Sequence, residues 1–181
     1  MLKIIKYPHP ALRKKAKPVK KITPAIQRFS QDLLKALVPK TGEPLGVGLA
    51  ANQVNKLWRI FIIKMPDDKF QVCINPQLLK TSKKTLKDLV EDKHFLEGCL
   101  SIPGYYGLVD RPIKIKVKYQ TPQGLSKTKT LTPPYSSYFQ HELDHLNGIL
   151  FINYIKQKKE QLYLADKQNK MQPVNFPSSF S

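Results

Sequence analysis

The feature that most constrains this chain is the segment FQHELDHLNGILF at residues 139–151, which contains His141, Glu142 and His145. If the segment is helical, the two histidines lie four residues apart on one face and could bind one metal ion. Glu142 would lie beside them, close enough to exchange a proton with a water molecule at the metal. A hydrolytic metal site usually has three protein ligands and one position open for water. The pattern therefore predicts a catalytic metal site whose third ligand lies elsewhere in the chain.

Three positions are candidates for the third ligand. A metzincin-type protease would need a histidine at position 151, where the chain has Phe151, and this excludes that class. A thermolysin-type protease would take a downstream glutamate, but Glu160 lies within the basic run KQKKEQ. Cys99, in the upstream segment EGCLSIPG, offers a thiolate, which with two imidazoles suits a borderline or soft divalent ion. Cys99 is the better candidate, whereas Cys73 lies in an apolar strand pattern and is expected in the core.

The composition indicates one globular domain with a basic surface. The chain has 181 residues and carries 31 lysines and arginines against 13 acidic residues, which gives a net charge of +18. Such a charge attracts polyanions such as RNA, but the lysines are dispersed with few aromatic residues among them, and this favours a solvated surface. No apolar run could span a bilayer and no targeting signal is visible, so a cytoplasmic location is expected.

Local patterns predict the main helices and strands. A helix is expected to start after Thr23 and to end at Pro39. The runs WRIFIIK (58–64) and QVCINP (71–76) predict strands, the second ending at Pro76. Apolar residues that alternate with lysines predict a β-hairpin over residues 113–131 with one solvated face. Residues 80–93 are expected to form a loop or insertion, one helix to carry the histidine motif after the proline pair at 133–134, and another to span about 154–170.

Three motifs in this order resemble the signature motifs of the peptide deformylase family: GVGLAANQ (46–53), EGCLS (97–101) and QHELDH (140–145). The segments YPHPALRKKAKPV and GLVDRPIKIKVKYQTPQG are also similar to the family, and the resemblance covers roughly residues 2–154. It implies an α+β fold in which small antiparallel sheets pack around a central helix carrying the His-Glu-x-x-His motif, with a C-terminal helix. Residues 1–171 would form a single catalytic domain, and residues 172–181 a flexible tail.

The resemblance also implies a role for individual residues. The metal ligands would be Cys99, His141 and His145. Glu142 would transfer protons, and Gln53 and the backbone N–H of Leu100 would stabilise the oxyanion of the tetrahedral intermediate. The substrate would lie along the first motif, and a buried ion-pair network would orient the imidazoles. The residues expected in these last two roles are Val47 and Gly48 for the substrate, and Glu97, Asp144 and Arg111 for the network.

The activity implied by the resemblance is removal of the N-formyl group from the formyl-methionine of nascent polypeptides, giving formate and a free N-terminus. The expected metal is Fe²⁺, with Zn²⁺, Ni²⁺ or Co²⁺ as substitutes, and the ribosome is an expected partner through the basic surface and the C-terminal helix. The run LTPPYSSYF (131–139) departs from the aliphatic run of the family, which leaves a deformylase-like protein of altered substrate preference as one alternative. A basic RNA- or ribosome-binding protein with a structural metal site is the other.

Overall fold

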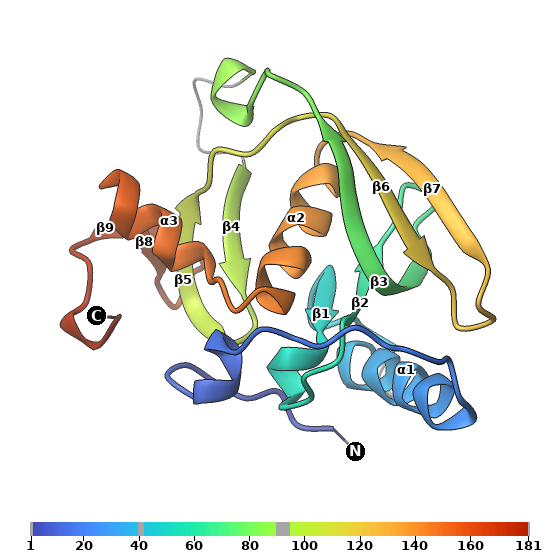
Figure 1. Cartoon of the computed structure of the whole chain (residues 1–181). Coiled ribbons are helices and arrows are strands. Elements are labelled where there is room, and N and C mark those ends of the chain that lie inside the picture. Colours follow the sequence, from blue (N-terminus) through green and yellow to red (C-terminus); the bar gives the residue numbers. More distant parts are fainter. Residues whose placement is uncertain (1, 40–41, 90–94, 181) are drawn as a thin grey trace.

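The computed structural model describes residues 2–39, 42–89 and 95–180, and it has two antiparallel sheets with a helix, α2, between them (Figure 1). The five-stranded sheet has the order β1 (Gly48–Ala50), β2 (Ile60–Lys64), β3 (Phe70–Thr81), β6 (Ile115–Gln120) and β7 (Ser126–Leu131). The four-stranded sheet has the order β4 (Leu96–Cys99), β5 (Ile102–Leu108), β8 (Leu162–Ala165) and β9 (Met171–Val174). The helices are α1 (Pro24–Leu37), α2 (Tyr135–Leu146) and α3 (Phe151–Lys158). The α+β fold predicted from the sequence is confirmed.

Helix α1 begins where the sequence predicts. The side chain of Thr23 accepts a hydrogen bond from the backbone N–H of Ile26 at 3.4 Å, and Pro24 takes the first helical position, where its missing N–H costs nothing. The apolar face of the helix packs on the outer side of β1 and β2, where Phe29 meets Trp58 edge-to-face with ring centroids 4.9 Å apart. This helix therefore covers one half of the outer face of the larger sheet.

Helix α2 packs on the opposite, inner side of that sheet. Phe139 is fully buried against Phe61 of β2, with ring centroids 5.0 Å apart, and Leu146 joins the same core. The remaining face of the helix points toward the smaller sheet, so the histidine motif lies between the two sheets. This packing fixes the helix axis, and with it the direction in which the motif projects.

Strand β6 confirms the alternating pattern of the sequence, whereas the buried face expected of its partner β7 is limited to Leu131. Ile115, Val117 and Tyr119 of β6 are buried, and the lysines between them are exposed. The turn closes with hydrogen bonds between Thr121 and Leu125 and from the N–H of Gly124, whose φ of +83° is a conformation that suits glycine. One face of this part of the sheet is thus core and the other is lysine-covered.

The predicted end of a strand at Pro76 is wrong, because β3 continues through this residue to Thr81. The register with β6 shifts between Ile74 and Gln77, so the proline sits at an irregularity where the ladder does not need its N–H. Asn75 takes a left-handed φ of 49° there, and its side chain accepts a hydrogen bond from the N–H of Val19 at 2.8 Å. The expected loop at 80–93 contains a short 3₁₀ helix, Leu86–Asp88, and its residues 90–94 lie outside the described ones.

The helix predicted over residues 154–170 is present as α3, but its predicted end is wrong. Helix α3 ends at Lys158, because Lys159 adopts a left-handed conformation with φ of 53°, and the chain then forms the β8–β9 hairpin. Of the segment 172–181, predicted to be a flexible tail, the first residues belong to β9. Phe180 is buried, and its ring meets the rings of Tyr7 and Tyr105 at 5.4 and 4.9 Å between centroids.

Within the residues that the structure describes, no helix combines the length and the apolar character that crossing a membrane requires.

The contact between Phe139 and the larger sheet generates the first prediction. Phe139→Ala removes a fully buried ring and is expected to lower the free energy of unfolding by about 3–5 kcal/mol, whereas Phe139→Leu should cost about 1 kcal/mol. Urea titration followed by circular dichroism measures both. Leu125→Ala, at a side chain that is 59% exposed, is the control and should stay within about 0.5 kcal/mol of the original protein. Equal losses in Leu125→Ala and Phe139→Ala would contradict this account of the core.

Candidate metal centre

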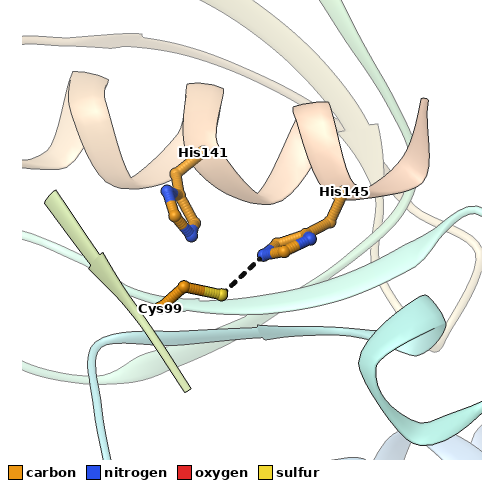
Figure 2. Close-up of side chains that lie close together, drawn as sticks. All are labelled: Cys99, His141 and His145. Carbon is orange, nitrogen blue, oxygen red and sulfur yellow. Dashed lines mark hydrogen bonds between the residues drawn. The ribbon is translucent and has the colours of Figure 1, made fainter. Parts of the chain in front are cut away.

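Three predicted ligands come together between the two sheets. Cys99 stands at the end of β4, and His141 and His145 project from one face of α2, as Figure 2 shows. One ligand atom from each residue lies within 4.8 Å of the other two, and the Cys99 Sγ is 3.2 Å from Nε2 of His145. One thiolate and two imidazoles are a donor set for a tetrahedral divalent ion with a fourth position left open. These residues fit a metal ion.

A buried ion-pair network contacts the His141 ring at its Nδ1 atom. The Nδ1 of His141 lies 2.9 Å from a carboxylate oxygen of Glu97, which leaves its Nε2 for a metal. Arg111 donates to both oxygens of Glu97 and, at 2.8 Å, to Asp144 of α2. The structure thus brings together the three residues that the sequence analysis assigned to such a network.

The network sets the charge states around the metal-free site. Burial alone would raise the pKa of Glu97, but Arg111 and His141 outweigh it and lower this pKa to about 2. Burial lowers the pKa of His141, yet its contacts with Cys99 and Glu97 raise it well above the usual range. The pKa of His145 is held well below its usual range by burial and by the nearby charges of His141 and Arg111. A metal ion would therefore have to displace a proton from His141 and would find His145 neutral.

Glu142 lies beside the candidate ligands in a buried position at the wall of a cavity. Burial raises the pKa of its carboxyl group to about 7, and Oε2 has no hydrogen-bond partner among the described residues. Gly48 of β1 passes directly over this carboxyl group, since a Cβ added at Gly48 would come within 2.9 Å of Cδ of Glu142. The absence of a side chain at Gly48 therefore leaves the space that the Glu142 carboxyl group occupies.

Gln53 reaches the same site from the short 3₁₀ helix Ala51–Val54. Its Oε1 accepts from the N–H of Ala50 at 2.8 Å, which turns its Nε2 toward Sγ of Cys99 at 3.5 Å. The Nε2 also donates to Oγ of Ser101 at 3.2 Å. Ser101 is fully buried and was missed by the sequence analysis, although it is the last residue of the EGCLS motif.

Two of the candidate ligands, Cys99 and His141, line a cavity of about 570 Å³. Val47, Gly48 and Leu100, which the sequence analysis had assigned to the substrate and to the oxyanion, line it. The run at residues 131–139, which departs from the family, contributes Pro134, Ser137 and Tyr138 to its wall. Other lining residues carry no local sequence motif that would have predicted their place in the wall, among them Lys6, Phe95, Tyr105 and Tyr106.

A helix carrying His-Glu-x-x-His, a cysteine from a neighbouring strand and an adjoining cavity define a metal-dependent hydrolase. The family model described as polypeptide deformylase matches residues 1–161. The chain therefore belongs to the peptide deformylase family. Membership of this family does not support the alternative of an RNA-binding protein whose metal site is only structural.

Individual relatives agree with the family model. The chain is 36% identical to a peptide deformylase from Pseudomonas aeruginosa, over 88% of this chain and 89% of the relative, and 35% identical to one from Hamiltonella defensa, over 97% and 96%. Among solved structures, peptide deformylase from Thermotoga maritima superposes with a TM-score of 0.75 at 34% identity, over 85% of this chain and 97% of that one. The enzyme from Thermus thermophilus gives a TM-score of 0.75 at 33% identity, covering 88% of each chain.

The second prediction concerns Arg111. Arg111→Ala leaves Glu97 and Asp144 buried without a counter-charge and is expected to lower the free energy of unfolding by about 3–5 kcal/mol at pH 7. Urea titration of the metal-free protein measures the change, with Arg28→Ala at an exposed position as the control.

The pH dependence of stability gives this prediction a second readout. Because folding lowers the pKa of Glu97 from 4.5 to about 2, its contribution is complete above pH 4.5 and is lost as the pH falls from 4.5 toward 2. Arg111→Ala should flatten that acid-side loss of stability. An unchanged slope between pH 4.5 and 2 would contradict the role of Arg111 in holding Glu97 ionised.

Proposed function

We propose that this chain removes the formyl group from the N-terminal formyl-methionine of nascent polypeptides, with residues 1–171 as a single catalytic domain. The observation that carries the proposal is the position of Glu142. Its buried carboxyl group, with a pKa of about 7, adjoins three metal-ligand side chains at the wall of a cavity. Hydrolysis of a formamide needs an activated water and a group that moves its proton, and with a metal ion bound this arrangement would supply both.

Cys99, His141 and His145 would hold the metal, which we propose to be Fe²⁺, with Zn²⁺, Ni²⁺ or Co²⁺ able to replace it. The thiolate supports a borderline or soft divalent ion over Mg²⁺ or Ca²⁺, which prefer oxygen ligands. When bound, such an ion acts as a Lewis acid that makes water a nucleophile near neutral pH. The ion pair of Glu97 with Arg111 would keep the His141 ring turned toward the ion.

Glu142 would move the proton in both halves of the reaction. A carboxyl group with a pKa near 7 can accept a proton from water and then deliver it to the leaving amine at the same pH. The Nε2 of Gln53 and the backbone N–H of Leu100 would donate to the oxygen that becomes negative in the tetrahedral intermediate. The bond from Ala50 to Oε1 of Gln53 supports this role, because it fixes the amide with Nε2 toward Cys99.

The substrate would lie between two strand edges. Strand β1 ends the larger sheet, strand β4 ends the smaller one, and residues of both line the cavity. An extended peptide could pair with such an edge through its own backbone, with Val47 and Gly48 beside it. Recognition through the backbone would place few requirements on the side chains of the peptide.

A deformylase of altered side-chain preference is a second candidate, favoured by the wall of Pro134, Ser137 and Tyr138. Turnover of formyl-Met and formyl-Leu peptides separates the two, since a methionine-selective enzyme must prefer the first.

The third prediction tests Glu142. Glu142→Ala should bind iron(II) as the original protein does, while formate release from formyl-Met-Ala-Ser under anaerobic conditions falls by roughly 10² to 10⁴. Cys99→Ala should instead lose the metal. Glu43→Ala, at an exposed carboxylate, is the matched control and should retain full activity. Full formate release by Glu142→Ala would sink the proposed mechanism.

We also propose that the protein works in the cytoplasm, close to the ribosome, and that the basic end of α3 docks there. Lys156, Lys158 and Lys159 are exposed around this end. Truncation is a poor test, because the residues that follow α3 form β8 and β9 and bury Phe180.

The fourth prediction therefore uses charge alone. Lys156, Lys158 and Lys159 are all replaced by Gln, and co-sedimentation with ribosomes at low salt should then fall. Formate release from a short peptide should not change. Co-sedimentation equal to that of the original protein would rule out docking through α3.

A further inference from the structure

The outer face of the five-stranded sheet has two halves with different chemistry. Helix α1 covers the half at β1 and β2, where Phe29 and Leu33 pack with Ile60 and Ile62. At β6 the same sheet presents exposed lysines instead. The second half is therefore a solvent-facing basic surface on an element that the candidate metal centre does not use.

Six exposed lysines lie in β3, in the loop that follows it, and in or directly before β6, and they are here named the lysine face. Lys80 of β3 stands directly opposite Lys116 of β6 in the register, and Lys118 stands opposite Gln77. Hydrogen bonds between Ser82 and Lys114, at 2.8 and 3.1 Å, tie the loop after β3 to β6. The lysine face consists of Lys80, Lys83, Lys84, Lys114, Lys116 and Lys118.

The charge of the lysine face is uncompensated within the described chain. None of the six lysines takes part in an ion pair there; the nearest such pair along the chain joins Lys87 to Glu160. Like charges directly opposite each other in a sheet are destabilising, so Lys80 and Lys116 weaken the strand pairing they belong to. An external anion would relieve that repulsion.

The neighbours of the lysines indicate which anion. Thr130 and Thr128 of β7 pair with Lys116 and Lys118, so hydroxyl groups alternate with ammonium groups on this surface. Lysine, threonine and glutamine are among the side chains that contact phosphate and sugar oxygens of nucleic acids. From Lys114 to Lys118 the strand extends about 13 Å, roughly the rise of four nucleotides.

We propose that the lysine face binds the phosphate backbone of RNA without reading its sequence. None of its six residues lines the substrate cavity, so the bound RNA leaves that cavity accessible. A membrane of anionic lipids would offer phosphates too, but the exposed apolar side chains of β3 beside the face are two, Leu78 at 39% and Leu79 at 48% exposure, which is little to insert into a bilayer. The proposal does not depend on the deformylase activity.

The test compares two variants with the same change in net charge, from +18 to +15. In the first, Lys80, Lys116 and Lys118 are replaced by Gln; in the second, the exposed Lys3, Lys14 and Lys15 of the N-terminal segment are replaced by Gln. Fluorescence anisotropy with a single-stranded RNA of mixed sequence, about 20 nucleotides long, measures affinity across a salt series. The first variant should bind at least about tenfold more weakly at about 0.1 M salt, and its slope of log K against log salt should fall by about 2, as expected for three lost phosphate contacts.

The second variant should stay within about threefold of the original affinity. Equal loss in both variants would overturn the proposal, because net charge alone would then explain the binding. Absence of RNA binding by the original protein would also overturn it, as would binding to vesicles of anionic lipid but not to RNA. Unchanged formate release by the first variant would show that its loss of RNA binding is separate from the catalytic site.

Discussion

The buried guanidinium group of Arg111 is the contact on which the rest of the site depends. It joins Glu97 of β4 to Asp144 of α2, and so it links the smaller sheet to the central helix. Glu97 in turn orients the ring of His141. Three charged groups are removed from water together, which is costly unless each is paired, and here each is. Replacing any one of these three groups would therefore disturb the orientation of the His141 ring.

The second constraint is the burial of the Glu142 carboxyl group. The same burial that raises its pKa from 4.5 to about 7 makes the ionised form unfavourable, so the fold carries this group at a cost that grows as the pH rises from 4.5 and is complete above about 7. The free energy for this comes from the cores on either side of α2, including the contact of Phe139 with Phe61. Catalytic groups that are held in a strained charge state need such rigid support.

The sequence predicted the residues of the candidate metal centre better than it predicted where helices and strands end. His141, Glu142 and His145 were found because a helix places residues four apart side by side, a rule that holds whatever the surroundings. Cys99 was favoured by the chemistry of its thiolate and strengthened by the family resemblance, whereas Gln53 came from that resemblance alone, since only the fold brings residues 53, 99 and 141 together. Helix α1 and the β6–β7 hairpin followed from their own periodicity. The end of α3 did not, because it depends on a left-handed Lys159 and on pairing of β8 with β5, which local patterns do not encode. Lys6 and Tyr106 reach the cavity only through tertiary packing.

The two facing strand edges have a consequence for how the protein behaves at high concentration. An unpaired edge is a template for sheet extension, and exposed edges are a common start of aggregation. Strand β1 is only three residues long, and β4 only four. Edges this short offer few backbone hydrogen bonds to a second copy of the protein. Very short edge strands are one way in which proteins limit aggregation through their sheets.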